Sequence, residues 1–196
     1  MNFKNTFIFI LTIGLLLVAG CGNEQTTPDS ENAIEIKVVN NSEEIIVSFA
    51  LFYGPDLDEW GEDLLNEEII GPGDNFVFMM PPGSYDLFLL TYENYVIDII
   101  RDIDGNHTIE IGEEGKLPIL FTNSTDVEVG RLFISPSESD SWGSDWLGQE
   151  VIPPGVSRFF FIEPGIYDIL AQDLSEETLI NVFDMTIESE AHLIIE

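Results

Sequence analysis

An internal repeat constrains the fold of this 196-residue chain more than any other feature of its sequence. With a shift of 82 residues, the stretch Asp58–Asp86 aligns without a gap with Asp140–Asp168, and 14 of the 29 aligned positions are identical. The identities include Trp, Gly and Pro in the same register, as in DEWG and DSWG. A period of this kind is typical of a supersecondary unit that is present twice. We therefore predict two tandem modules, at residues 34–114 and 117–196.

The same shift also pairs residues upstream of this stretch. It aligns Asn41-Ser42 with Asn123-Ser124, so we expect the two modules to be related by the same offset of 82 residues over most of their length. Only Gly115 and Lys116 separate the predicted modules, so the connection between them is short.

Each module has the pattern of an all-β fold. Short runs rich in β-branched and aromatic residues alternate with Gly, Pro, Asn and Asp turn signals, as expected for strands joined by tight turns. In the first run, Ile34, Ile36 and Val38 alternate with Glu35 and Lys37, which gives one apolar and one polar face. The expected strands are 34–39, 44–53, 75–80, 85–92, 95–101 and 107–111 in the first module, and 117–122, 127–135, 157–163, 167–172, 179–185 and 191–196 in the second.

This number of short strands in about 80 residues indicates an immunoglobulin-like or transthyretin-like β-sandwich in each module. The stretch PPGSYDLFLL, residues 81–90, resembles the strand entry of carboxypeptidase-regulatory and collagen-adhesin B-type modules. The longer stretch SPSESDSWGSDWLGQEVIPPG, residues 135–155, is similar to a repeat of uncharacterised secreted bacterial proteins. These resemblances imply exported tandem modules and bring no known activity with them.

The N-terminus predicts export. Lys4 precedes an apolar run from Phe7 to Ala19, which is shorter than the roughly 20 residues of a membrane-spanning helix and has the length of a signal-peptide core. The run ends in LVAGC, residues 17–21, and this segment resembles the lipobox of bacterial lipoproteins. The resemblance implies a signal peptide at 1–20 and fatty acyl chains, such as palmitate, on the cell-membrane anchor Cys21. Cys21 is the only cysteine, so an internal disulfide is excluded.

The polar stretch 22–33 predicts a flexible linker between Cys21 and the first module. The chain carries 37 acidic against 6 basic residues, a net charge of −31, and this balance argues against nucleic-acid binding. Because 44% of the residues are hydrophobic, the chain is expected to fold around apolar cores with an acidic surface. The expected location is the extracytoplasmic face of the cell membrane, with an envelope protein or a glycan as partner.

The densest acidic segments are the matching loops around Asp58 and Asp63, and around Asp140 and Asp145. Carboxylate and carbonyl oxygens are calcium ligands, so these four residues are the candidate metal ligands. Their spacing differs from that of an EF-hand loop, and the second copy has Ser141 and Ser144 where the first has glutamates. The favoured interpretation is structural: a short helical turn capped by Asp58 or Asp140, with Trp60 or Trp142 packed down and Leu65 or Leu147 closing the sandwich.

The sequence offers no catalytic constellation. The two histidines, His107 and His192, stand in the last strand of each module without an adjacent nucleophile motif. The Tyr-Asp pairs 85–86 and 167–168 are read as structural, with a tyrosine hydroxyl bonded to a neighbouring loop and an aspartate on the outer face of the strand. We expect a structural, adhesive or binding lipoprotein without catalysis or cofactor. A calcium-binding protein is the alternative, and an extracellular hydrolase is less favoured.

Overall fold

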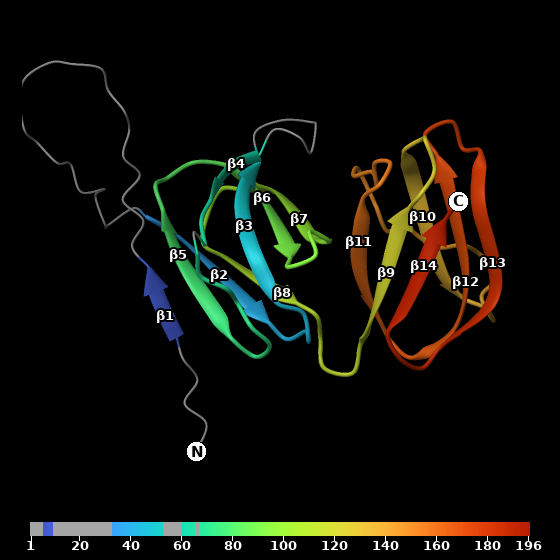
Figure 1. The fold of residues 1–196 in the computed structure, drawn as a ribbon, viewed down its shortest axis with the longest axis horizontal. Coiled ribbons are helices and arrows are strands. Elements are labelled where there is room, and N and C mark those ends of the chain that lie inside the picture. The colour runs from blue at the N-terminus through green and yellow to red at the C-terminus, as the bar shows by residue number, and fades with distance from the viewer. Residues whose placement is uncertain (1–5, 10–32, 53–59, 66) are drawn as a thin grey trace, which may run out of the picture. The chain divides into compact units, whose positions relative to one another are not determined.

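A computed structural model describes residues 6–9, 33–52, 60–65 and 67–196 (Figure 1). The chain forms two compact units. The first unit comprises the residues up to Leu89 together with Ile99–Ile111, and the second comprises Leu90–Asp98 and Gly112–Glu196.

The predicted all-β fold is confirmed, since the described residues contain β-strands and no helix. The alternation of β-branched and aromatic residues produces most of the expected strands within about two residues of the predicted bounds. In chain order the strands are β1 (Thr6–Phe9), β2 (Ile34–Asn40), β3 (Ile46–Phe52), β4 (Trp60–Asp63), β5 (Asn75–Met80), β6 (Tyr85–Thr91), β7 (Val96–Ile103), β8 (His107–Ile111), β9 (Leu117–Asn123), β10 (Val129–Pro136), β11 (Ser157–Ile162), β12 (Gly165–Asp173), β13 (Thr178–Ile187) and β14 (Ala191–Ile195).

The first unit is built from two groups of paired strands. In one group, β2 pairs antiparallel with β5 and parallel with β8, and β1 adds to β5 in parallel. In the other, the order is β7-β6-β3-β4, with the end of β6 and the start of β7 assigned to the second unit. The predicted alternation in β2 is observed, because Ile34, Ile36 and Val38 are buried while Glu35 is exposed. Phe49 of β3 and Phe78 of β5 pack with ring centroids 4.3 Å apart, so residues of both groups share one core.

The second unit repeats this arrangement. One sheet has the order β14-β9-β11 and the other β10-β12-β13. The core cluster draws buried side chains from both sheets, among them Ile119 and Phe121 of β9, Leu132 of β10 and Ile169 of β12. Two sheets that bury their facing side chains against each other form a β-sandwich, as predicted.

One buried asparagine per copy corrects the offset between the two copies. Asn40 and Asn123 are both fully buried, and the side-chain amide of each donates to two carbonyls. Asn40 binds Glu44 O (2.7 Å) and Ile70 O (3.0 Å). Asn123 binds Val127 O (2.8 Å) and Ile152 O (2.8 Å). Asn123 therefore corresponds to Asn40, an offset of 83, and the alignment of Asn123 with Asn41 is wrong.

The offset changes between the second strand and the acidic loop. Leu132 N donates to Asp145 Oδ1 thirteen residues away, whereas Phe49 N donates to Asp63 Oδ1 fourteen residues away. The first copy therefore has one more residue in this connection. An extra residue in a connection between strands costs little free energy, so the cores of the two copies can keep matching contacts.

Candidate functional site

The acidic loops are the first candidate site. In each copy the carboxylate of the second aspartate, Asp63 or Asp145, accepts hydrogen bonds from backbone amides. Asp63 Oδ1 accepts hydrogen bonds from Phe49 N (3.0 Å) and Leu65 N (3.1 Å). Asp145 Oδ1 accepts from Leu132 N and Leu147 N, both at 3.0 Å. The bond to the amide two residues ahead is an Asx-turn, and the second bond attaches the loop to the neighbouring strand. Both aspartates have a structural role in the loop.

The other two candidate ligands are placed differently. Asp140 is exposed, and Asp58 lies outside the described residues. Among the described residues, no group of three or more His, Cys, Asp or Glu side chains is arranged to hold a metal ion. Calcium binding by Asp58, Asp63, Asp140 and Asp145 stays a prediction.

The expected helical turn is wrong in the described part of both loops. Trp60–Asp63 is a short strand, β4, and residues 137–150 contain turns and bends only. In both loops an oxygen of the second aspartate, Asp63 or Asp145, also accepts from an amide of the neighbouring strand, which ties the loop to the sheet. Leu65 (1% exposed) and Leu147 (4%) are buried as expected, so the apolar residue of the loop does close the sandwich.

The two Tyr-Asp pairs have the predicted structural contacts. Tyr85 Oη donates to Pro81 O (2.7 Å), and Tyr167 Oη donates to Glu163 O (2.9 Å). Asp86 Oδ1 accepts from Asp102 N (2.9 Å), and its Oδ2 lies 3.1 Å from Arg101 Nη1 in an ion pair.

Asp168 has a backbone partner that corresponds to that of Asp86 but a different side-chain partner. Its Oδ1 accepts from Asp184 N (2.9 Å) and from Ser137 Oγ (2.6 Å). Phe183 occupies the position that corresponds to Arg101, so this part of the second copy lacks the cation of the first.

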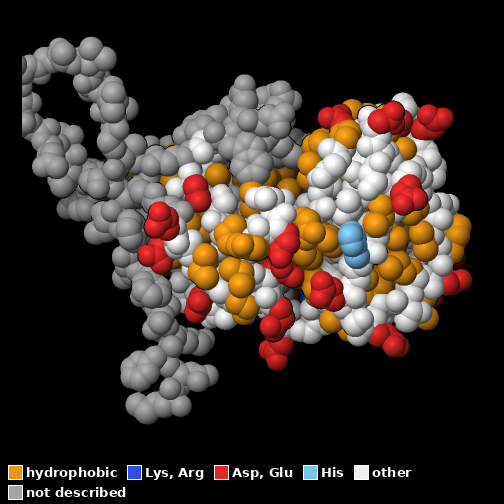
Figure 2. Space-filling view, in the orientation of Figure 1, with side chains coloured by type: hydrophobic (Ala, Val, Ile, Leu, Met, Phe, Trp, Pro, Cys, Tyr) orange, Lys and Arg blue, Asp and Glu red, His pale blue; other side chains and the backbone are white. Residues whose placement is uncertain are grey.

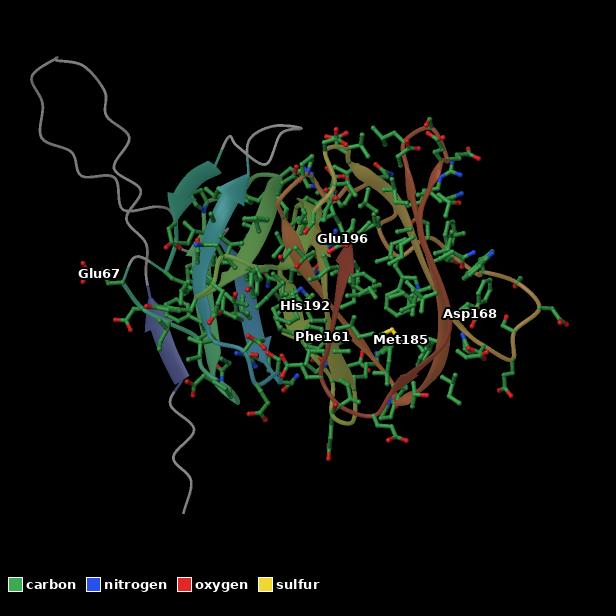
Figure 3. The ribbon with its side chains drawn as sticks, turned by 45° about the vertical axis from the view of Figure 1, so that its right-hand side comes forward. Glu67, Phe161, Asp168, Met185, His192 and Glu196 are labelled. Carbon is green, nitrogen blue, oxygen red and sulfur yellow. The ribbon has the colours of Figure 1, made fainter. Side chains whose placement is uncertain are left out.

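The two histidines lie in the last strand of each copy, as predicted. His107 opens β8 and is exposed, and His192 lies on β14 (Figure 3). His192 Nε2 is 2.8 Å from Thr122 Oγ1, which in turn is 2.7 Å from Ser157 Oγ. A histidine bonded to a threonine hydroxyl across two paired strands has the ordinary contacts of a partly exposed strand residue.

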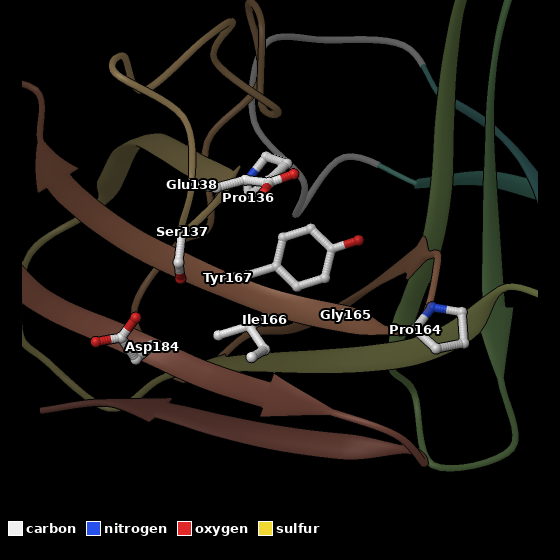
Figure 4. Close-up of a pocket in the computed structure, with 8 residues that line it drawn as sticks. All are labelled: Pro136, Ser137, Glu138, Pro164, Gly165, Ile166, Tyr167 and Asp184. Atoms are coloured by element: carbon white, nitrogen blue, oxygen red, sulfur yellow. The ribbon is translucent and has the colours of Figure 1, made fainter.

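A cleft of about 590 Å³ opens on the second unit (Figure 4). It lies where β10 ends and β12 begins, and Asp184 of β13 borders it. Its volume falls within the range of known ligand pockets, roughly 300–1,000 Å³. The lining residues are Pro136, Ser137, Glu138, Pro164, Gly165, Ile166, Tyr167 and Asp184.

The cleft combines an apolar surface with acidic groups. Ile166 is 52% exposed, and the Tyr167 ring extends toward the same space as Glu138 (Figure 4). Burial raises the pKa of the Tyr167 hydroxyl, and the nearby Glu163 carboxylate raises it further. Tyr167 is therefore a neutral hydrogen-bonding aromatic group at physiological pH.

Sequence reasoning missed this cleft. The available signal was the set of positions at which the otherwise similar copies differ, namely Ser84 against Ile166 and Arg101 against Phe183. Those differences remove a polar group and a cation from the second copy and leave apolar side chains in their place.

The segment around Cys21 lies outside the described residues, so lipidation stays a prediction. Among the residues that the structure does describe, there is no helix with the length and apolar character needed to cross a membrane.

Comparisons with known proteins give little further information. No protein-family model matches the chain, and no curated protein matches it. A solved structure, "The Bacillus anthracis TIE protein", is similar at 11% sequence identity with a TM-score of 0.28. The match covers 84% of this chain and 34% of that chain. A likeness at this TM-score carries no argument about fold or function.

Proposed function

We propose that this protein is a lipid-anchored extracytoplasmic lipoprotein with an adhesive or binding role and no catalytic activity. The observation that carries the proposal is the sequence LVAGC at residues 17–21, which places the only cysteine of the chain directly after a signal-peptide pattern. A thiol at that position serves as the attachment point for lipid. The β-sandwich units would then lie outside the membrane, beyond the polar linker 22–33.

The physical chemistry of the anchor supports this proposal. Each buried methylene of an acyl chain contributes about 0.8 kcal/mol, and two or three chains give stable attachment where one is marginal. The acidic chain would gain nothing from anionic lipid headgroups, so its retention at a membrane would depend on the acyl chains.

The geometry of the sandwich units supports a binding role over catalysis. The paired aspartates and tyrosines that could be nominated as reacting groups are bonded to backbone amides and carbonyls within the fold. The cleft on the second unit offers an apolar surface with carboxylates beside it, which is suited to holding a partner.

The test of anchoring compares the full chain with Cys21→Ser in cells supplied with labelled fatty acid. The parent should incorporate label and fractionate with membranes, whereas Cys21→Ser should lose both properties. Equal membrane retention of the two proteins would overturn the anchor.

The test of the binding role uses the full lipidated chain in detergent as bait for envelope extracts and glycan panels. Retention of a partner that a matched acidic lipoprotein does not retain supports the role. If the protein retains no partner, the binding role is contradicted. Hydrolysis of a glycan in the panel would also contradict the proposal, provided that the activity persists after further purification of the protein.

A further inference from the structure

We propose that the cleft lined by Ile166 and Tyr167 on the second unit binds a basic polypeptide segment that also carries apolar residues. This inference rests on the binding role proposed above and names the class of partner. It involves the second copy alone, because the chemistry of the cleft depends on residues that the first copy replaces.

The first argument is the apolar surface. Ile166 is 52% exposed and stands between Gly165 and Tyr167 at the start of β12. Phe183 precedes the lining residue Asp184 on β13 and does not itself line the cleft; it is 60% exposed, and its ring centroid lies 6.1 Å from that of Trp142. Large apolar side chains exposed next to a concave surface mark interaction sites on soluble domains. The corresponding positions of the first copy hold Ser84 and Arg101.

The second argument is the charge around the cleft. The carboxylates of Glu138 and Asp184 border it, and neither forms an ion pair or side-chain hydrogen bond with another described residue. The three Lys and Arg residues of this unit are engaged elsewhere. Lys116 pairs with Glu113 at 2.9 Å, Arg131 pairs with Glu176 at 2.9 Å, and Arg158 is buried.

The net charge of the whole chain has the same sign, at −31. On the face shown in Figure 2, Asp and Glu side chains stand out between hydrophobic ones, while Lys and Arg are nearly absent. A field of one sign concentrates ligands of the opposite charge and steers their approach. A cationic partner is therefore favoured over a neutral or anionic one.

The third argument is the fit of a lysine or arginine side chain to this surface. Such a side chain has an apolar stem that packs on Ile166 and a cationic head that reaches Glu138 or Asp184. The face of Tyr167 adds an attraction for the cation, and Arg in particular stacks on aromatic rings. A polypeptide that carries both basic and apolar side chains satisfies both parts of the cleft at once.

The experiment measures binding of fluorescent peptides of about ten residues to the full lipidated chain in detergent. One peptide alternates Lys with Val, a second alternates Glu with Val, and a third alternates Lys with Ser. The Lys-Val peptide should bind most tightly. Its affinity should fall as salt is raised from about 0.05 to 0.5 M, because exposed charge pairs are screened over a few ångströms at high salt.

The variants are chosen from the chain's own first copy. Ile166→Ser and Phe183→Arg recreate Ser84 and Arg101, and each should weaken Lys-Val binding about tenfold or more. Asp184→Asn removes a charge at a left-handed residue (φ 53°) that asparagine accepts well. Glu188→Gln removes an exposed charge that does not line the cleft, and it should leave the affinity unchanged. Far-ultraviolet circular dichroism checks that each variant is folded.

Two results would overturn the inference. Binding that is equally reduced by Glu188→Gln and Asp184→Asn would show general charge attraction without a site. Preference for the Glu-Val peptide or for a neutral glycan would show a different partner. If the inference fails while the full chain still retains an envelope partner, the proposed function stands. Loss of envelope capture and of lipid labelling would instead contradict the proposed function itself.

Discussion

The buried side chain of Asn123 provides the sharpest test of what holds the second unit together. Its amide nitrogen donates to Val127 O and Ile152 O, and its Oδ1 accepts from Thr125 N (3.0 Å) and Thr125 Oγ1 (2.7 Å). The backbone of Asn123 adds bonds to Val156 and Gly155 at 3.0 and 2.7 Å. All four hydrogen-bonding positions of the side chain are filled, so no replacement residue can reproduce the set.

The cost of Asn123→Ala follows from these bonds. Each hydrogen bond contributes about 1 kcal/mol net, and the substitution removes four side-chain bonds. Both carbonyls keep one partner in the variant, because the Thr125 hydroxyl, released from Asn123 Oδ1, can donate to Val127 O at 2.8 Å, and Val129 N donates to Ile152 O. The full penalty of an orphaned carbonyl is thereby avoided. We expect the free energy of unfolding to fall by roughly 3–5 kcal/mol, a large share of the 5–15 kcal/mol of an ordinary domain.

The assay is urea unfolding followed by tryptophan fluorescence in a Trp60→Phe background. The two remaining tryptophans, Trp142 and Trp146, both belong to the second unit and so report on it alone. Asn123→Asp is a matched variant of the same shape that turns two donors into acceptors facing carbonyls. It should be at least as unstable at neutral pH and partly recover in acid, as the carboxyl group becomes protonated.

Ser124→Ala is the control, because the neighbouring serine is exposed. It should change the free energy of unfolding by less than about 0.5 kcal/mol. If Asn123→Ala and Ser124→Ala unfold at the same urea concentration, the reasoning about this buried network is refuted.

Three further predictions concern other parts of the fold. Gly130→Ala should lower the free energy of unfolding by about 1–3 kcal/mol in thermal melts, because a Cβ there would lie 3.0 Å from the Leu174 backbone; Gly105→Ala, with open space around it, is the control. Ser175→Ala should raise the pKa of Asp173 in a carbon-13 NMR titration, since hydrogen bonds from the Ser175 hydroxyl and from backbone amides hold that pKa below its ordinary 3.8. The stability that this carboxylate adds is present above pH 3.8 and is lost as the pH falls through its folded-state pKa. An unchanged pKa of Asp173 in the variant would contradict the assignment. Calorimetry of the full chain with calcium should give only heat of dilution, because Asp63 and Asp145 are bonded to backbone amides; saturable heat that disappears in Asp63→Asn plus Asp145→Asn would instead favour a calcium site.

The strands were predictable because alternation is a local property. Ile34, Ile36 and Val38 specify one buried face regardless of what packs against them, and the turn residues delimit each run. The exact bounds shift by a residue or two, as at Ile46, where the first bonded residue of β3 depends on its bridge to Ile70.

The errors came from features that depend on tertiary contacts. The offset between copies changes by one residue between Phe49 and Asp63, and the contacts of the two asparagines and the two loop aspartates show where. The acidic loops look like capped helix starts because aspartate is favoured in both settings. The packing of the two sheets decides which amide donates to Asp145 Oδ1, and in this fold it is Leu132 N of the neighbouring strand.

The cleft was out of reach of sequence reasoning for a similar reason. Glu138, Ile166 and Asp184 are scattered over three segments and meet only because β12 lies between β10 and β13. Single-sequence patterns report the faces of strands, whereas the end of a sandwich is formed by turns whose positions follow from the assembled sheets.

Mass spectrometry of the N-terminal peptide from membrane-extracted protein is the most direct test of lipidation at Cys21. We expect the mature chain to begin at Cys21 and to carry the mass of a diacylglycerol, with or without a third acyl chain. A peptide that begins at Met1, or an unmodified Cys21 in protein recovered from membranes, would contradict it.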